Sequence, residues 1–197
     1  MGDRTAFFYG TLMAPEVLHR VCYGPGTVGK DPAKTYLASQ LSFQPAILHD
    51  YCRHRVRQCD YPGIVAENGH NVRGTYVAGL TDGDIHRLDI FEGDEYRRIE
   101  VKVELPKEAG NFVQAETYLY TAGERKLEKK EWSYEEFRRD KMHRWADNSN
   151  EYQEVDEAFE DDPTGGRGVK ADTSVKTDKE AKEEAEEEER DVLNGAV

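Results

Sequence analysis

RTAFFYGTLMAPEVLHRVCY, residues 4–23, is the stretch that says most about the fold. Its first six residues are rich in aromatic side chains and end at Gly10, which predicts a strand followed by a turn. Pro15 favours the first turn of a helix, and the apolar residues of 15–23 recur at helical spacing. A strand, a glycine turn and a helix therefore follow one another at the start of the chain.

The rest of the chain predicts mostly short strands with few helices. We expect strands at 41–48, 51–56, 64–66, 72–78, 97–105 and 115–120. A second helix begins near Thr81, where TDGD has the hydroxyl and acid of a capping box, and it ends at Gly93. A last helix is expected within 132–146, capped by Ser133 and Glu136, with Phe137 and Trp145 inward. This pattern indicates an α+β fold with a sheet curled toward a barrel.

The net charge of −13 is concentrated near the C-terminal end. Residues 148–197 hold 17 acidic and 6 basic side chains and carry −11, which leaves about −2 on residues 1–147. Low hydrophobicity with high charge predicts disorder, so we expect one domain over 1–147 and an acidic, disordered tail over 148–197. Tyr152, Val155 and Phe159 have the spacing of one helical face and hint that the start of the tail packs back.

Composition argues against several classes of partner. No apolar run approaches the ~20 residues of a transmembrane helix, and we find no signal-peptide pattern, so we expect no membrane association. Basic clusters are short and the net charge is negative, which argues against nucleic-acid binding. Cys22, Cys52 and Cys59 are too few for a disulfide scaffold, and we expect reduced thiols in a cytoplasmic or nuclear protein. The oligomeric state is left open.

The first candidate site is the loop Tyr9-Gly10-Thr11-Leu12 between the first strand and the first helix. A strand, a glycine turn and a helix start leave several backbone N–H groups unpaired and pointing the same way. Such a nest suits a carboxylate or phosphate. The alternative is an ordinary strand-to-helix connection, which these residues alone favour.

The second candidate is Glu92, at the end of the second helix. At about 100° per residue, Glu92 lies about 20° around the helix axis from Ile85, and Asp89 lies about 40° on the other side. Both acids thus share the face that Ile85 and Leu88 should bury. Partial burial and the negative end of the helix dipole both raise the pKa of a carboxyl, as a general base requires. The alternative is a helix-terminal acid that reaches solvent.

Other sites are weaker on sequence alone. Cys52, His54 and Cys59 suggest zinc, but their spacing fits no common ligand set, and we expect no metal. A Cys–His nucleophile is less favoured than buried structural cysteine. No glycine-rich dinucleotide motif is present, and no cofactor is expected.

Five motifs in one order carry a resemblance to a known family. They are Tyr9-Gly10-Thr11-Leu12, Tyr61-Pro62-Gly63-Ile64-Val65, Val72-Arg73-Gly74-Thr75-Tyr76, Leu88-Asp89-Ile90-Phe91-Glu92-Gly93 and Tyr96-Arg97-Arg98. Together they resemble the gamma-glutamylcyclotransferase-like superfamily, and within it the branch of plant avirulence-induced proteins and their fungal relatives. The resemblance spans about residues 6–120 and leaves out the tail.

The resemblance implies a small mixed β-barrel with flanking helices and a cavity at one end. It would place Tyr9, Gly10, Thr11 and Leu12 around the substrate, with loop amides holding the α-carboxylate of a gamma-glutamyl group. It would make Glu92 the general base. Tyr96 and Arg97 stand where the family has a Y-x-R-like extension after the glutamate, and Tyr118 or Tyr120 would line the same cavity, all as looser assignments.

The implied activity is a gamma-glutamylcyclotransferase reaction on a small-molecule gamma-glutamyl substrate. Glu92 would act as general acid and base while the α-amine closes on the γ-carbonyl, releasing 5-oxoproline and an amine or peptide. The alternative function is a catalytically inactive small-ligand-binding module whose acidic tail recruits a partner. Because the tail lies outside the resemblance, deleting residues 148–197 is expected to leave catalysis intact.

Overall fold

Five long strands dominate the computed structural model, which describes residues 2–25, 29–107, 110–146, 152–161 and 176–177. The strands are β1 (Arg4–Phe8), β2 (Ser42–Val56), β3 (Pro62–Leu80), β4 (Tyr96–Glu104), β5 (Phe112–Tyr120), β6 (Leu127–Glu128) and β7 (Lys176–Thr177). The helices are α1 (Pro15–Tyr23), α2 (Pro32–Ser39), α3 (Asp82–Glu92), α4 (Tyr134–Asp140), α5 (Met142–Ala146) and α6 (Gln153–Asp161). Short 3-10 turns are η1 (Thr11–Met13), η2 (Gly93–Glu95) and η3 (Glu124–Lys126).

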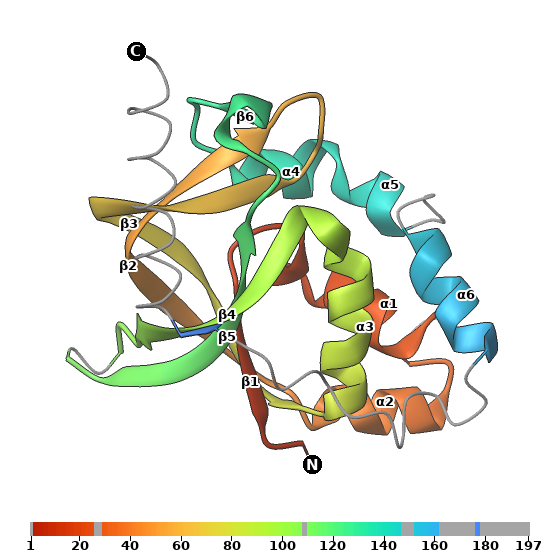
Figure 1. Cartoon of the computed structure of the whole chain (residues 1–197). Coiled ribbons are helices and arrows are strands. Elements are labelled where there is room, and N and C mark those ends of the chain that lie inside the picture. Colours follow the sequence, from red (N-terminus) through yellow and green to blue (C-terminus); the bar gives the residue numbers. More distant parts are fainter. Residues whose placement is uncertain (1, 26–28, 108–109, 147–151, 162–175, 178–197) are drawn as a thin grey trace.

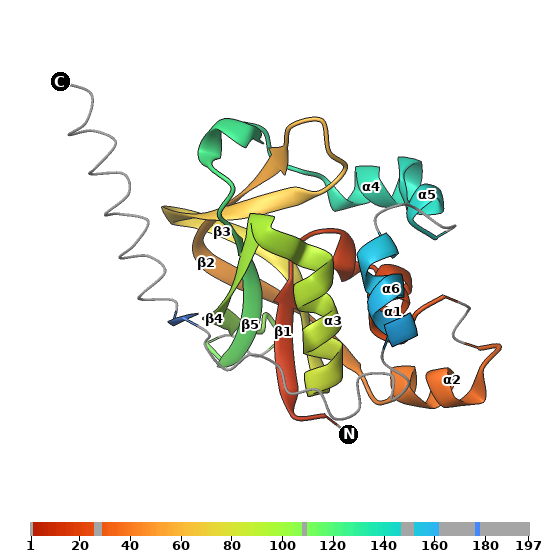
Figure 2. The same ribbon diagram turned by 45° about the vertical axis from the view of Figure 1, so that its right-hand side comes forward.

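The five long strands close into a mixed barrel. Their order is β2-β3-β1-β5-β4, and β4 returns to β2 where Ile47 pairs with Glu104 and Leu48 with Val103. β1 runs parallel to β5, whereas the other pairs in the ring are antiparallel. The helices gather on one side of the barrel (Figures 1 and 2). The expected α+β fold, a small mixed β-barrel with flanking helices, is therefore confirmed.

β1 separates two hydrophobic clusters, because successive side chains of a strand point to opposite faces. Phe7 lies in the cluster that fills the barrel, with Leu48 and Tyr51. Phe8 lies in the cluster between the barrel and the helices, with Leu18 of α1 and many of its neighbours. The chain leaves this central strand directly into the loop at Gly10, so the loop starts from a rigid and fully packed position.

β2 and β3 are longer than the sequence predicts. Each was expected as two short strands, yet each runs through its polar middle. The pairing of β2 with β3 breaks at a bulge, where Asp50 of β2, with a φ of 61°, faces four residues of β3, 67–70. Asp50 Oδ1 accepts a hydrogen bond from the Gly69 amide (3.0 Å). The polar run 67–71, which reads as a turn, thus forms the bulged part of β3, with Gly69 at a φ of 80°.

Two of the expected helices form as predicted. α1 begins at Pro15, and α3 has the expected capping box, in which Thr81 Oγ1 accepts from the Asp84 amide (3.1 Å) and Asp84 Oδ2 accepts from the Thr81 amide (2.8 Å). Gly93 ends α3 with a φ of 62°, a conformation that favours glycine. This sharp end turns the chain into η2 and places Glu92 on the last turn.

The other helices differ from expectation. α2 was not predicted, because only Ala38 of its residues is buried and it has no apolar stripe. Its signal is the start, where Asp31 Oδ1 accepts from the Ala33 amide (2.8 Å) and Pro32 occupies the first turn. The single helix expected within 132–146 is two helices, α4 and α5, which are separated at Lys141.

The segment set aside as a tail begins with a helix that packs on the domain. Tyr152 and Val155 are fully buried, and α6 contacts α3. Both Nη groups of Arg20 in α1 donate hydrogen bonds to the carboxylate of Asp156 (2.7 and 2.6 Å). The hint from Tyr152 and Val155 is thus borne out by their burial, whereas the side chain of Phe159 and the expected disorder of 162–175 and 178–197 lie outside the described residues.

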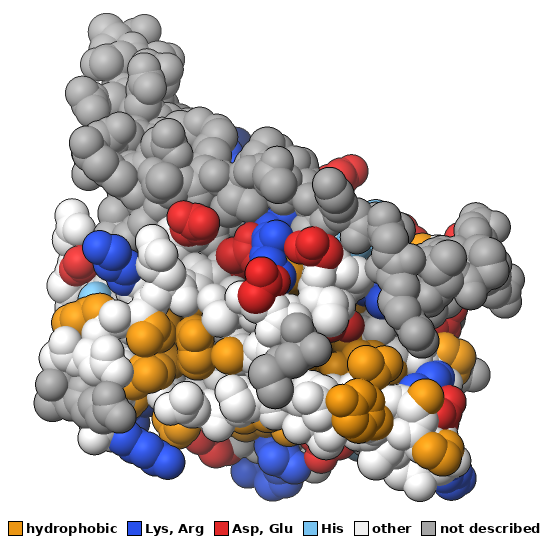
Figure 3. Space-filling view, turned by 90° about the horizontal axis from the view of Figure 1, so that it is seen from below, with side chains coloured by type: hydrophobic (Ala, Val, Ile, Leu, Met, Phe, Trp, Pro, Cys, Tyr) orange, Lys and Arg blue, Asp and Glu red, His pale blue; other side chains and the backbone are white. Residues whose placement is uncertain are grey.

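The surface carries no extended hydrophobic face in the view of Figure 3, where hydrophobic side chains lie in patches among acidic and basic ones. The large hydrophobic side chains exposed among the described residues are Tyr36, Leu37 and Phe112. In the same part of the chain, no helix is long and apolar enough to cross a membrane. Cys22, Cys52 and Cys59 are free thiols.

Candidate active site

A cavity of about 90 Å³ opens where β1 and η1 meet the start of β3 and the end of α3. This volume suits a small group rather than a drug-sized ligand. The structure brings seven of the site residues predicted from the sequence to this one cavity, namely Tyr9, Gly10, Thr11, Leu12, Glu92, Tyr96 and Tyr118. Arg97, also named from the resemblance, is not among the residues that line it. Their placement together is an observation, whereas their roles stay predictions.

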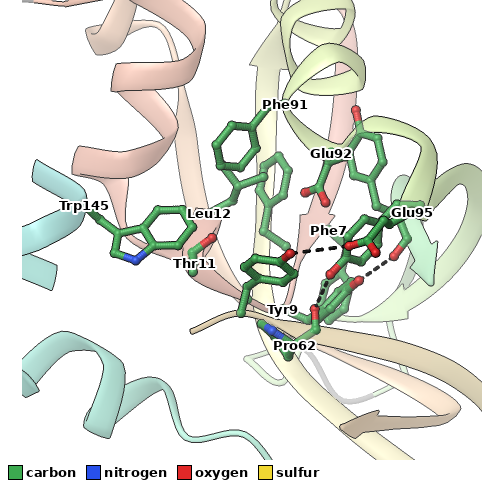
Figure 4. Close-up of a pocket in the computed structure, with 14 residues that line it drawn as sticks. Phe7, Tyr9, Thr11, Leu12, Pro62, Phe91, Glu92, Glu95 and Trp145 are labelled. Carbon is green, nitrogen blue, oxygen red and sulfur yellow. Dashed lines mark hydrogen bonds between the residues drawn. The ribbon is translucent and has the colours of Figure 1, made fainter. Parts of the chain in front are cut away.

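Glu92 reaches the cavity from the last turn of α3, and its carboxylate points among the residues drawn in Figure 4. Ile85 and Leu88 on the same helix face are fully buried, as the helical spacing predicts. Burial raises the pKa of Glu92 from 4.5 to about 8, and the nearby negative charge of Asp89 adds to the rise. A carboxyl with this pKa can both accept and return a proton near neutral pH.

Asp89 is held in place by two donors. Arg98 Nε on β4 and the Tyr118 hydroxyl on β5 each donate to Asp89 Oδ1, both at 2.9 Å. Arg98 is buried and also donates to Glu116, which is in turn paired with Arg4. The network fixes a negative charge one helical turn from Glu92. The charge of Asp89 is therefore a second cause of the raised pKa of Glu92, after burial, and these hydrogen bonds hold it in place.

The loop after β1 lines the same cavity as this carboxyl. Met13 and Ala14 donate back to the carbonyls of Gly10 and Thr11 (both 3.1 Å) and form the turn η1. Within the described part of the chain, no acceptor takes up the amides of Gly10, Thr11 and Leu12. Three such N–H groups can hold a carboxylate, because successive unpaired amides form an anion-binding concavity.

The start of the loop is fixed from two sides. A Cβ on Gly10 would lie 3.0 Å from the ring carbons of Pro62, so a larger residue would press into the cavity wall. Arg53 Nη1 donates to the carbonyl of Tyr9 (2.8 Å), and the Arg53 guanidinium lies over the ring of Trp132, 5.5 Å from its centroid. The loop position is thus set by contacts outside the loop itself.

The tyrosine hydroxyls at the cavity are occupied by the protein. Tyr9 donates to the carbonyl of Tyr118 (2.6 Å), and Tyr96 donates to the carbonyl of Pro62 (2.9 Å). Burial raises the pKa of Tyr9, Tyr96 and Tyr118 above its ordinary value, so all three stay protonated donors. Because the hydroxyl groups of Tyr9 and Tyr96 already donate to backbone carbonyls, these two residues can contact a ligand with their aromatic rings.

The sequence analysis did not name the remaining lining residues as site residues. They are Phe7, Phe8, Tyr61, Pro62, Phe91, Glu95 and Trp145. Some had a signal: Tyr61-Pro62 and Phe91 lie in the motifs of the resemblance, and Trp145 was expected to point inward. Glu95 had none, because its position follows from the turn η2. Tyr120, a looser assignment, instead packs with Val56 and Leu127.

Glu95 is a second carboxylate at the cavity. Lys126 Nζ lies 3.0 Å from its Oε1, and the Tyr61 hydroxyl donates to its Oε2 at 3.4 Å. Lys126 offsets the negative charge of Glu95, and the hydrogen bond to Glu95 from Tyr61 is drawn as a dashed line in Figure 4. Because the lining residues described here include no histidine or cysteine, a metal in the cavity would have only carboxylate side chains as charged ligands.

Comparison with known proteins places these features in a family context. The model of the family described as "Gamma-glutamyl cyclotransferase, AIG2-like" matches residues 6–138. The chain is similar to Protein AIG2 C of Arabidopsis thaliana, with 28% identity over 136 residues that cover 69% of this chain and 73% of the relative. It is also similar to Protein AIG2 B of that plant, with 30% identity over 146 residues, 74% of this chain and 77% of the relative.

A solved structure shares the fold. The solution structure of a protein from Arabidopsis thaliana aligns with a TM-score of 0.51 at 23% identity, covering 87% of this chain and 93% of that chain. At this identity the likeness concerns the fold alone. The family match ends within α4, so α5 and α6 lie beyond it.

Proposed function

Because the chain belongs to the gamma-glutamyl cyclotransferase, AIG2-like family, we propose that it converts a gamma-glutamyl compound into 5-oxoproline and a free amine or peptide. The observation that carries this proposal is the position of Glu92. Burial raises its pKa to about 8, and it lines the same small cavity as the loop residues Gly10, Thr11 and Leu12. An anion site beside a tuned base is what this reaction needs.

The loop amides of Gly10, Thr11 and Leu12 hold the α-carboxylate in this proposal. The α-amine of the substrate then lies next to that carboxylate, within reach of Glu92. Fixing both groups on one rigid loop and one helix end aligns the amine with its own γ-carbonyl carbon. Such positioning supplies a large share of the acceleration in an intramolecular reaction.

Glu92 moves one proton twice. At neutral pH the α-amine is an ammonium group, and the Glu92 carboxylate first removes one of its protons. The nitrogen then attacks the γ-carbonyl carbon to close a five-membered ring and loses its second surplus proton to solvent. The tetrahedral intermediate collapses, the bond to the leaving nitrogen breaks, and Glu92 gives its proton to that nitrogen. The products are 5-oxoproline and the released amine, which takes up one proton from solvent, so the proton count is unchanged. One residue therefore suffices as base and acid.

A substrate panel tests the proposal. The full chain is incubated with gamma-glutamyl amino acids, glutathione and gamma-glutamyl-ε-lysine, and 5-oxoproline is measured by chromatography. Formation of 5-oxoproline from any member supports the enzyme. If no member gives product while gamma-glutamyl compounds still bind in calorimetry, the chain is a small-ligand-binding module instead.

The pH dependence of kcat/KM is a second expected result. The free enzyme needs Glu92 deprotonated, so kcat/KM should rise with pH along an acid limb whose apparent pKa is about 8. The alkaline limb belongs to the amine of the substrate and should differ between substrates, whereas the acid limb should not. A profile that stays flat up to about pH 8 would contradict a base with this pKa.

Asp89→Asn should move that acid limb to lower pH. The substitution removes a negative charge that raises the pKa of Glu92. It leaves the positive charge of Arg98, which is then no longer paired with Asp89. Both effects favour ionised Glu92. Glu95→Gln is the matched control, because it neutralises a carboxyl that lines the cavity but is not among the causes of the raised pKa of Glu92. The apparent pKa of the acid limb is compared between the two variants and the wild-type chain, and circular dichroism checks that each variant folds. If Asp89→Asn leaves the acid limb where it is in the wild-type chain, Asp89 does not raise the pKa of Glu92.

A further inference from the structure

Among the described residues, one group of side chains outside the cavity has the composition of a metal site. The ligand atoms of Cys52, His54 and Glu67 all lie within 4.8 Å of one another. None of the three lines the cavity around Glu92. They come from the two strands of the long β2–β3 hairpin: Cys52 and His54 lie just beyond the bulge, and Glu67 lies at its edge.

The strand register explains why these residues meet. Cys52 and His54 are two apart on β2 and so share one face of the strand. Tyr51 packs inside the barrel, so Cys52 and His54 lie on the opposite, outward face. Cys52 pairs with Val65, and Glu67 is two residues farther along β3 on that same face. The spacing along the chain fits no common metal motif, which is why the sequence alone argued against zinc.

Glu67 is the centre of the group. Its Oε2 lies 3.8 Å from His54 Nε2, and its Oε1 lies 3.2 Å from His70 Nε2. It is also close enough to Cys52 to raise the pKa of the thiol, in addition to the larger effect of burial. Carboxylate, imidazole and thiol thus converge on one point, and a second histidine contacts the other carboxylate oxygen, as an outer partner of a metal ligand commonly does.

We propose that Cys52, His54 and Glu67 bind one Zn²⁺ ion or a similar transition metal on the outer face of the β2–β3 hairpin. A set of one sulfur, one nitrogen and one oxygen suits zinc, whereas Mg²⁺ and Ca²⁺ prefer oxygen ligands alone. Binding releases the thiol proton of Cys52 to solvent and leaves the imidazole of His54 neutral. Three protein ligands leave the fourth tetrahedral position open to water.

The metal would cross-link the two strands beyond the bulge. His54 and Glu67 are each partly exposed, with side-chain exposures of 19% and 46%, so an ion can reach the group from solvent. Arg53, which alternates to the opposite face, holds the carbonyl of Tyr9 at the cavity. The proposed ion therefore stiffens the strand segment that carries this contact without touching the cavity.

Co²⁺ binding to the full chain tests the proposal, because a thiolate ligand gives cobalt a charge-transfer absorption band. We expect one Co²⁺ per chain with this band, displacement by Zn²⁺, and no displacement by excess Mg²⁺. Cys52→Ala should abolish the band, and Glu67→Gln should weaken binding at least about tenfold. Cys59→Ala is the matched control, since Cys59 is another partly buried free thiol, and it should leave the band unchanged.

The outcomes separate the metal site from the proposed reaction, because no readout depends on 5-oxoproline. A missing band in the wild-type chain, or a band that survives Cys52→Ala, would overturn the site. If Cys52→Ala does not fold, as judged by circular dichroism, His54→Gln takes its place, and unchanged binding in that variant would likewise overturn it. Zn²⁺ should also raise Tm by roughly 5–10 °C at a hundredfold excess over Kd.

Discussion

Glu92→Gln should lower the rate of 5-oxoproline formation by about 10²- to 10⁴-fold, the range that a positioned general acid–base residue contributes. Gln keeps the size of the side chain at the cavity but can neither accept the proton of the α-amine nor return it. Because the substitution leaves untouched the loop amides that we propose to hold the α-carboxylate, KM should change far less than kcat. The measurement is kcat and KM on the best substrate of the panel.

Stability against pH shows whether a loss of activity reflects chemistry or misfolding. Native Glu92 keeps its proton up to about pH 8, whereas in the unfolded chain it loses the proton near 4.5. Between these values the native state binds more protons, so the wild-type protein loses stability as pH rises. Gln escapes this loss, so above about pH 8 the variant should be the more stable protein, by on the order of 2–4 kcal/mol.

Two results would count against the role of Glu92. One is 5-oxoproline formation at the wild-type rate in Glu92→Gln, which would assign the proton transfers elsewhere. The other is that Glu92→Gln unfolds more easily than the wild-type chain at about pH 9. This would mean that burial of the ionised Glu92 carboxylate does not destabilise the native wild-type protein. Urea titrations at about pH 6 and about pH 9 measure the difference.

The sequence predicted the site better than it predicted the outer elements of the fold. Glu92 and the loop at Gly10 lie at sharp ends of regular elements, and such ends have local signals: the glycine after a strand, the capping box at Thr81 and the terminal Gly93. Helical spacing then placed Glu92 beside Ile85. Features with local signals of this kind can be read from one stretch of chain.

Features with a weak local signal, or with a dependence on distant pairing, are the ones that the sequence predicted poorly. α2 has a capping aspartate but no apolar stripe, and α6 lies in a charged stretch where only Tyr152 and Val155 mark its buried face. The group of Cys52, His54 and Glu67 needs the register of β2 against β3, which a bulge at Asp50 shifts. No rule of sequence spacing contains that register.

Truncating the chain after residue 147 should lower the free energy of unfolding by about 3–5 kcal/mol, whereas truncation after residue 161 should change it by less than about 1 kcal/mol. The shorter form loses Tyr152 and Val155, which are fully buried, and the ion pair between Arg20 and Asp156. The burial of these residues argues against the expectation, drawn from the extent of the resemblance, that deleting residues 148–197 leaves catalysis intact.

The same truncation should reduce activity through the cavity wall. Phe91 and Trp145 line the cavity, and Tyr152 stacks on Phe91 with ring centroids 5.8 Å apart. The Tyr152 hydroxyl donates to the carbonyl of Trp145 (2.9 Å), and its ring meets that of Trp145 edge-on. Without α6 these two lining side chains lose their outer support, so KM should rise along with the loss of stability.

Point variants separate the helix from the chain beyond it. Tyr152→Ala should reproduce most of the effect of the shorter form, at a cost of about 3–5 kcal/mol. Tyr152→Phe keeps the stacking on Phe91, loses only the hydroxyl, and should cost about 1 kcal/mol. If truncation after 147 and truncation after 161 gave equal stability and equal KM, α6 would have no part in the domain. If only the removal of 162–197 reduced activity, the acidic segment itself would act on the site. The burial of Tyr152 against Phe91 and Trp145 favours the expected result, in which truncation after residue 147 has the larger effect. In that case the functional domain extends through α6.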